Sequence, residues 1–199
     1  MNINVKNIND CTVSNKVEQV SNLVYEGFKY KFTSKLFSDK EVFGVITSLC
    51  EYIILKKPEK LYIAESSGTI CACLFLTTNG EKYTDLYSSL KKSLSLSQCF
   101  RLLFLLGLLS HNPKNEESYI DFVTVSSEFR NMGIGKALIL HCKDLFPEKT
   151  LTLYVAEHNQ KAYELYDRLG FVTMKKQSSI IMNSVIGLKK WAFMELKNN

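Results

Sequence analysis

The sequence predicts an α/β (α+β) protein with one mixed sheet and helices on both of its faces. Three observations predict this fold class. Helical and strand patterns both occur, with helices first, then a hairpin, an inserted helix, a strand–helix–strand–helix unit and a last strand pair. The 199 residues suit a single domain over residues 1–199. Hydrophobic residues make up 46% of the chain and charged residues 23%, which is typical of a globular protein.

The individual elements follow from apolar periodicity and from turn residues. Apolar side chains that recur every three or four residues predict helices at 15–32, 39–56, 85–110, 133–146 and 159–169. Short runs that end in turn residues predict strands at 60–65, 69–77, 118–125, 150–155, 171–176 and 188–196. The strands at 60–65 and 69–77 form the hairpin, and a loop joins the last two.

Composition narrows the class of protein. A net charge of +5 suits an anionic ligand but is too small and scattered to indicate nucleic acid by itself. The six cysteines form no CxxC pair, so we expect reduced, buried thiols, and no His/Cys/Asp set has the spacing of metal ligands. The first residues contain no apolar signal core, which favours a cytoplasmic protein. The apolar run at 102–109 is too short to span a bilayer.

A glycine-rich turn is the first feature that points to chemistry. Residues 119–138 read YIDFVTVSSEFRNMGIGKAL, so a strand leads through Arg130–Gly135 into a helix. Unpaired N–H groups at a helix start, with glycines that let a ligand approach, form a cradle for pyrophosphate. Ala137 and Leu138 break the Walker A and dinucleotide-binding patterns, respectively. A plain turn at the start of a helix is the alternative.

The turn and its surroundings resemble the acetyl-CoA-binding motif of the GNAT N-acetyltransferase superfamily, V-x-P-x-x-[RQ]-x-x-G-x-[GA]. Here it reads as residues 125–135, with Ser127 in place of proline and Asn131 in place of a common glycine. Asparagine tolerates left-handed backbone angles, so the turn remains feasible. The family's second motif, N-x-x-A-x-x-x-Y-x-x-x-G-F, is matched in full by Asn159, Ala162, Tyr166, Gly170 and Phe171.

The resemblance implies acetyl-CoA as cosubstrate, and the lack of metal-ligand spacing noted above implies no metal. It implies that the strands at 119–125 and 150–155 splay apart and pair with the cofactor arm, whose amides would bond the backbone like an added strand. It also places the Tyr166 hydroxyl near the thioester sulfur as general acid; a core tyrosine is the alternative, and Tyr163 is a nearby competitor. Asn159 would bond the cofactor arm or simply cap its helix. The expected cofactor-binding residues are Val123, Thr124, Val125, Arg130, Asn131, Met132, Gly133, Ile134, Gly135, Lys136, Asn159 and Tyr166.

The sequence defines the general base and the group that accepts the acetyl group less well than it defines the cofactor site. Asp121 is the nearest carboxylate in the strand and, by the period of two, shares a face with Tyr119, Val123 and Val125; Glu117, Glu65 or a water chain are alternatives. The helices at 15–32 and 39–56 and the segment 85–115 should frame the acceptor, a primary amine of a small molecule or protein. The apolar run reads as a buried helix, a homodimer interface or a lid. A non-catalytic acyl-CoA sensor is the alternative function, and a basic nucleic-acid-binding domain is a third.

Overall fold

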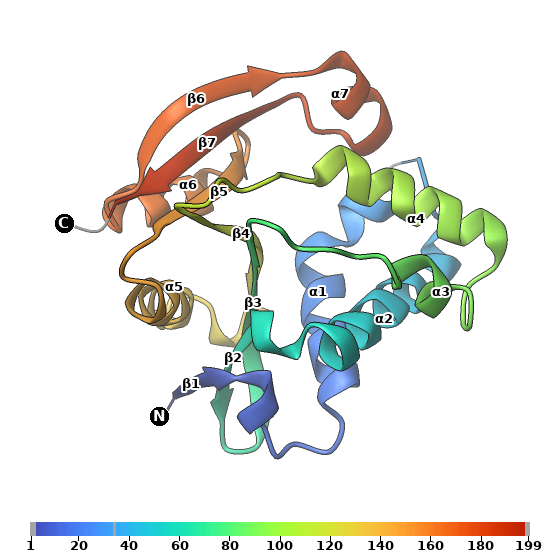
Figure 1. Ribbon diagram of the computed structural model, residues 1–199, viewed down its shortest axis with the longest axis horizontal. Coiled ribbons are helices and arrows are strands. Elements are labelled where there is room, and N and C mark those ends of the chain that lie inside the picture. Colours follow the sequence, from blue (N-terminus) through green and yellow to red (C-terminus); the bar gives the residue numbers. More distant parts are fainter. Residues whose placement is uncertain (1–2, 34, 198–199) are drawn as a thin grey trace.

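The computed structural model describes residues 3–33 and 35–197 and contains one seven-stranded sheet in the order β1-β2-β3-β4-β5-β7-β6 (Figure 1). Neighbouring strands are antiparallel except for the parallel pair β4–β5. The strands are β1 (Asn4–Asn7), β2 (Leu61–Ser66), β3 (Thr69–Thr78), β4 (Glu117–Val125), β5 (Thr150–Ala156), β6 (Val172–Ser178) and β7 (Lys190–Leu196). The helices are α1 (Lys16–Thr33), α2 (Asp39–Lys56), α3 (Leu86–Leu90), α4 (Leu96–Leu109), α5 (Ile134–Leu145), α6 (Gln160–Arg168) and α7 (Ile180–Ile186).

The predicted mixed α/β fold is therefore confirmed, with three corrections. The helix expected at 85–110 is two helices, because Ser95 and Gln98 form a capping box that starts α4 afresh. The loop between the last two strands contains α7, which Ser179 caps by accepting a hydrogen bond from the Met182 N–H at 3.2 Å. Strand β1, which pairs with the edge of β2, was not predicted, since its four residues are mostly polar.

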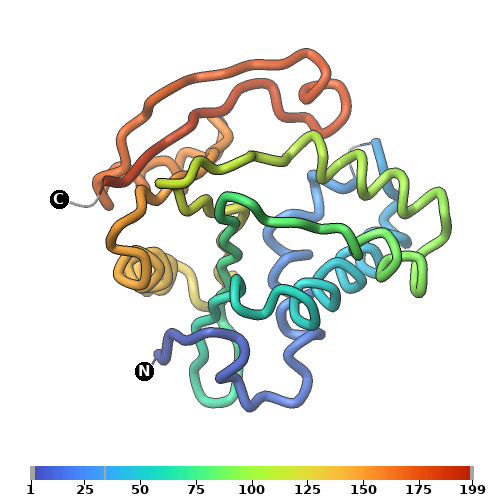
Figure 2. The backbone as a smooth tube through the Cα atoms, viewed as in Figure 1, coloured from blue at the N-terminus to red at the C-terminus, as the bar shows by residue number. Residues whose placement is uncertain are grey.

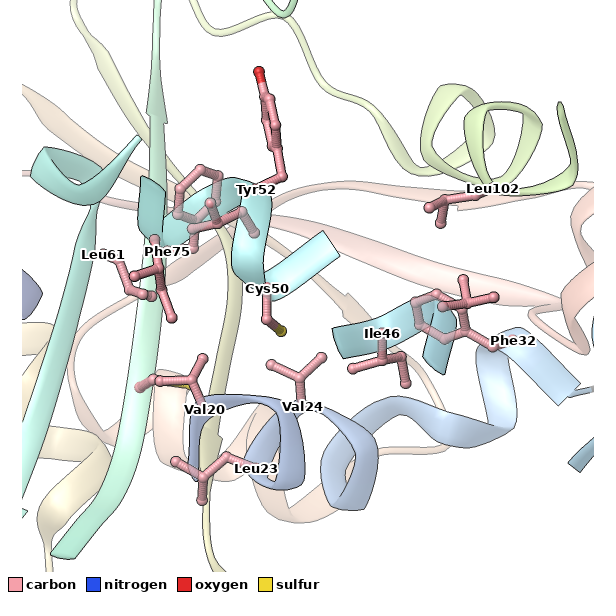
Figure 3. Close-up of a cluster of buried hydrophobic side chains, with 14 of the residues drawn as sticks. Val20, Leu23, Val24, Phe32, Ile46, Cys50, Tyr52, Leu61, Phe75 and Leu102 are labelled. Carbon is pink, nitrogen blue, oxygen red and sulfur yellow. The ribbon is translucent and has the colours of Figure 1, made fainter. Parts of the chain in front are cut away.

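Two apolar layers hold the helices on the sheet. On one face α1, α2 and α4 pack together, and Figure 3 shows side chains such as Val24, Ile46 and Phe75 converging there. On the other face α5 and α6 cover Leu74, Ile120 and their neighbours. Helices thus cover both faces, as the sequence indicates (Figure 1). All six cysteines are buried and unpaired, which confirms the expectation of reduced thiols.

Helix α4 is fastened to the start of α2 by a charged network. Arg101 donates to the Leu36 carbonyl at 2.6 Å and to Glu41 at 2.8 Å. The helix buries Cys99, Leu102 and Leu105, while Leu96, Phe100 and Phe104 are exposed along its outer side. The apolar run is thus partly a buried helix, and the homodimer interface stays a prediction. Within residues 3–33 and 35–197, no helix is both long and apolar enough to cross a bilayer.

Two irregularities of the sheet meet on β4. The pairing of β4 with β5 ends at Ile120 and Leu153, so the two strands separate beyond these residues. The pairing of β4 with β3 shifts register at the same level: Leu76 faces Ile120 whereas Phe75 faces Phe122, which leaves Asp121 without a partner. This is a β-bulge, a feature that redirects side chains. The expected splay of the parallel pair is confirmed, and the bulge is additional.

Candidate active site

The gap between β4 and β5 exposes backbone groups of two valines. The Ser126 N–H donates to the Cys71 carbonyl at 2.9 Å, so this position is a hydrogen-bonded pair of the β3–β4 ladder. Hydrogen-bonded and non-bonded positions alternate in an antiparallel pair. Val125 and Val123, which face Ala72 and Leu74, therefore direct their backbone N–H and C=O groups away from β3, toward the gap.

Thr124 does not face the gap. It stands opposite Cys73 at a hydrogen-bonded position, so its backbone groups point to β3. Its hydroxyl donates to the Leu23 carbonyl of α1 at 3.3 Å, and its side chain is buried. Among the expected cofactor contacts on this strand, the geometry favours the two valines and leaves Thr124 with a structural role against α1.

The glycine-rich turn has the conformation that the motif requires. Asn131 adopts φ +63° and Gly133 adopts φ +75°, both in the left-handed region, and α5 begins immediately afterwards at Ile134. Ile134 is buried, so only its backbone can meet a ligand. A Cβ at Gly135 would lie 3.5 Å from the Val125 side chain, which shows how closely α5 approaches β4. The N-terminal N–H groups of a twelve-residue helix are thus presented at the end of the gap.

The two cationic residues of this turn differ in their contacts: Arg130 is paired with protein groups, and Lys136 is exposed. Arg130 donates from Nε to the Val125 carbonyl at 3.2 Å and forms an ion pair with Glu26 of α1 at 3.0 Å. Glu26 also accepts from the Ser127 N–H at 2.8 Å. Arg130 therefore braces the turn, and its guanidinium is already partly neutralised. Lys136 is exposed, as is Met132, and both sit beside the helix start.

Helix α6 places Asn159 and Tyr166 beside β5. Asn159 caps the helix, since its side-chain oxygen accepts a hydrogen bond from the Ala162 N–H at 3.4 Å. This is the capping role that the sequence allows as an alternative to cofactor binding. Tyr166 is 7% exposed, and burial raises its pKa to about 12. Its hydroxyl has no hydrogen-bond partner among the described residues, yet it is not sealed from solvent as Ser118 Oγ and Thr152 Oγ1 are. The competitor Tyr163 is engaged elsewhere, since its hydroxyl lies 2.9 Å from Thr173 Oγ1 on β6.

A cavity of about 600 Å³ opens on the α1–α2 side of β4. Its walls come from α1, α2, the end of α4, the segment that follows β3 and the loop before β4; Figure 2 shows the segment after β3 running across toward α3. Apolar side chains such as Phe28, Ile53 and Phe122 dominate the lining. The segments expected to frame the acceptor therefore do enclose a cavity, and Leu106 and Leu109 of the apolar run form part of its wall.

Asp121 enters this cavity because of the bulge. Val123 and Val125 pack on the α5 side, whereas Asp121 and Phe122 line the cavity on the α1 side. The expectation that Asp121 shares a face with Val123 and Val125 is therefore wrong, since one extra residue in β4 resets the alternation. Dense protein surrounds the carboxyl while the cavity keeps it accessible, and this burial raises the pKa of Asp121 to about 7.

Within residues 3–33 and 35–197, no cation forms an ion pair with Asp121, and its side-chain hydrogen-bond partner is a hydroxyl group. Thr77 donates a hydrogen bond to the carboxylate, which opposes the rise of the Asp121 pKa, and the Tyr83 hydroxyl lies 3.2 Å from Thr77 Oγ1. The alternative bases are placed differently. Glu65 pairs with Lys6 at 2.7 Å beside the β2–β3 turn, and Glu117 is buried behind His111. Neither lines the cavity.

The structure adds residues that sequence reasoning missed. Thr77, Tyr83 and His111 all line the cavity, and His111 Nε2 lies 3.1 Å from Glu117 Oε2. The His111 ring also contacts Tyr119, Tyr154 and Phe193, with ring centroids 4.6 to 5.6 Å apart. No local motif marks these residues, because they converge from separate strands and loops. Within residues 3–33 and 35–197, no cluster of three or more His, Cys, Asp or Glu side chains is arranged to hold a metal ion.

Comparison with known proteins places this site in a family. Residues 18–171, more than half of the chain, match the acetyltransferase (GNAT) family. A 5-NmdU N-acetyltransferase of Pseudomonas phage PaMx11 is 40% identical over 55 residues, which cover 28% of this chain and 39% of that protein. The match thus spans well under two thirds of the phage protein.

Solved structures share the fold at low sequence identity. An N-acetyltransferase from Staphylococcus aureus Mu50 superposes with a TM-score of 0.70 at 13% identity, over 97% of this chain and all of that one. A histone acetyltransferase HPA2-related protein from Corynebacterium glutamicum gives a TM-score of 0.68 at 20% identity, over 100% and 98% of the two chains. PaiA N-acetyltransferase from Thermoplasma acidophilum, solved with coenzyme A, gives 0.58 at 14% identity, over 99% of each. The chain belongs to the GNAT acetyltransferase family.

Proposed function

We propose that this protein is an acetyl-CoA-dependent N-acetyltransferase that moves an acetyl group to a primary amine of a small molecule or protein by direct attack. One observation carries the proposal: the bulge at Asp121 lies where the β4–β5 gap, which Val123 and Val125 face with their backbone groups, meets the cavity. A thioester in the gap and an amine in the cavity would then share one strand. We place the activity in one domain, and the unpaired cysteines support the reducing cytoplasm as its location.

The residues that would hold acetyl-CoA fit its chemistry. Backbone groups of Val123 and Val125 would pair with the amides of the pantetheine arm like an added strand. The turn from Asn131 to Gly135 and the start of α5 would bind the pyrophosphate, with Lys136 adding charge. Arg130 would act mainly by holding the turn. The free Asn159 amide N–H₂ would reach the arm while its oxygen caps α6.

The chemical step requires a neutral amine. Asp121 would bind the ammonium form and take one proton, leaving a lone pair that attacks the thioester carbonyl carbon. The Val123 N–H, which faces the gap, would stabilise the oxyanion of the tetrahedral adduct. Collapse of the adduct forms the amide and breaks the C–S bond. The second nitrogen proton ends on the coenzyme A sulfur.

Tyr166 would assist the departure of the thiolate as a hydrogen-bond donor. Burial raises its pKa to about 12, so the hydroxyl stays protonated at neutral pH. A thiol has an ordinary pKa of about 8.5, so a phenol of this kind is the weaker acid. We therefore expect Tyr166 to stabilise the developing thiolate while water completes the protonation, which modifies the simple general-acid role implied by the family resemblance.

The binding half of the proposal is tested by titration with acetyl-CoA, free coenzyme A and longer acyl-CoAs, followed by thermal shift. A ligand at a hundred times its dissociation constant should stabilise the folded protein by about 2.7 kcal/mol. No shift with any of these compounds would remove the proposal. Turnover is then measured with a panel of amines by detection of free thiol.

The alternative, a non-catalytic acyl-CoA sensor, uses the same gap and is separated by Tyr166→Phe. Retained acetyl-CoA binding with kcat lowered about tenfold or more supports catalysis, since a hydrogen bond to a charged group contributes about 1.5–3 kcal/mol. Binding of acetyl-CoA without turnover of any amine favours the sensor. A nucleic-acid-binding domain would require salt-sensitive binding of DNA or RNA.

A further inference from the structure

The acceptor cavity carries a lysine that the proposed reaction does not use. Lys31, on the C-terminal turn of α1, lines the same cavity as Asp121. Its Nζ lies 4.8 Å from the centre of the Phe28 ring and makes no ion pair with any carboxylate of residues 3–33 and 35–197. Burial alone lowers the pKa of Lys31 to about 8. Lys31 is half-buried, and an ammonium in a mainly apolar cavity without an anionic partner is costly, so its presence there needs an explanation.

Asp121 is a carboxylate on the wall of the same cavity, and it forms no ion pair with Lys31. No cation forms an ion pair with Asp121 among the described residues, and its hydrogen bond comes from the neutral Thr77 hydroxyl. Lys31 and Asp121 thus present opposite charges on the wall of one cavity without pairing with each other. The surfaces around them are mainly apolar, from side chains such as Phe28, Ile53 and Phe122.

We propose that the acceptor is a small zwitterionic amine with an apolar body, bound with its ammonium at Asp121 and its carboxylate at Lys31. This inference rests on the proposed acetyl transfer and narrows its substrate class. Each of the two charged groups then gains a partner of opposite sign, and the apolar middle of the ligand contacts the aromatic wall. The cavity volume of about 600 Å³ lies in the range of small-molecule sites.

The arrangement favours such a ligand over a protein amino group or a simple alkylamine. A simple alkylamine satisfies Asp121 and leaves Lys31 unpaired in an apolar setting. A peptide bound by its N-terminal amine would have to carry an acidic group at the right distance inside the same cavity. A free α-amino acid or ω-amino acid supplies that acidic group as its own carboxylate, and no peptide chain has to enter the cavity.

The test compares ω-amino acids of increasing length with n-alkylamines of equal carbon count, and phenylalanine with phenethylamine, by thiol release from acetyl-CoA. The best acid should have a KM at least about tenfold below that of its matched amine, the effect of a hydrogen-bonded charge pair. Lys31→Met should abolish this preference, and Lys31→Arg should retain much of it. Lys29→Met is the matched control, because Lys29 lies on α1, contacts Tyr25 and is exposed; it should retain the preference.

A wild-type protein that uses alkylamines as well as the matched acids, or a Lys31→Met variant that keeps the preference, would overturn the inference. Binding decides the matter if no amine is turned over. Caproate, which has the carboxylate and the apolar chain but no amine, should raise the melting temperature of the wild type and not that of Lys31→Met. Absence of a caproate shift overturns the carboxylate site, whereas absence of an acetyl-CoA shift removes the proposed function itself.

Discussion

Replacing the Asp121 carboxyl by an amide tests the base directly. Asp121→Asn preserves shape and the hydrogen bond from Thr77 but cannot take a proton at neutral pH. General-base catalysis contributes about 10²–10⁴-fold to rate, so kcat/KM should fall within this range at pH 8. Because the carboxyl accepts hydrogen bonds from one hydroxyl and carries no cation, we expect the variant to remain folded.

The pH dependence of this loss gives a sharper test than its size. Burial raises the pKa of Asp121 to about 7, so the active, ionised form is lost as pH falls through 7. About half of the carboxyls are ionised at pH 7 and about a tenth at pH 6. The wild-type kcat/KM should therefore rise with pH to a break near 7 and then level off, because the ammonium form that Asp121 binds persists up to the pKa of the amine.

The Asp121→Asn variant is the control, because it depends on the neutral amine and its kcat/KM should keep rising with pH without a break near 7. A break that only the wild type shows therefore reports Asp121. Thiol release is followed from pH 5 to 9 at low acceptor concentration, with circular dichroism to verify folding at each pH. A wild-type profile without a break near pH 7, or with one near the ordinary carboxyl pKa of about 4, would refute the assignment of Asp121 as the base.

Other consequences concern the neighbours of this carboxyl and the glycines. Thr77→Val removes the hydrogen bond that opposes the raised pKa, so the midpoint of the pH–rate profile should move to higher pH, and an unchanged midpoint would contradict this. A Cβ at Gly27 would lie 2.5 Å from Thr124 Oγ1, whereas one at Gly44 meets nothing within 4 Å. Chemical denaturation should therefore find Gly27→Ala less stable than Gly44→Ala by about 1–3 kcal/mol, the cost of overpacking, since the gain in helix propensity is common to both. Gly133→Ala strains a residue at φ +75° by about 1–2 kcal/mol and should weaken acetyl-CoA binding in a calorimetric titration.

The elements of the fold were largely predictable because each buries one face against the sheet. The expected helix at 39–56 is α2 to the residue, and the strand and helix on either side of the glycine turn lie where the motif indicates. The spacing of apolar residues along the chain indicates which face of each helix or strand is buried. The break between α3 and α4 was less visible, since the capping box at Ser95 lies inside a segment that is helical on both sides.

The acceptor half of the site was not predictable in the same way. Tyr166 and Gly133 belong to contiguous motifs, which a single sequence reveals. Lys31, Thr77 and His111 come from α1, the end of β3 and a loop, and only the folded chain brings them to one cavity. Spacing along the sequence contains no information about such convergence, so the sequence indicated which segments frame the cavity without indicating which side chains line it.

The bulge in β4 lets one strand face both the cavity and the β4–β5 gap, which the proposed reaction requires. An unbroken strand would place Asp121 on the α5 side with Val123 and Val125, inside the apolar layer that also contains Tyr166. One extra residue moves the Asp121 carboxyl to the α1 side, while the backbone of the next residues still faces the gap beside β5. In the proposed reaction, the Asp121 carboxyl would then face the cavity, while the nearby Val123 N–H would face the thioester in the gap. Removing the bulge by deleting one residue would therefore separate the two halves of the reaction even if both ligands still bound.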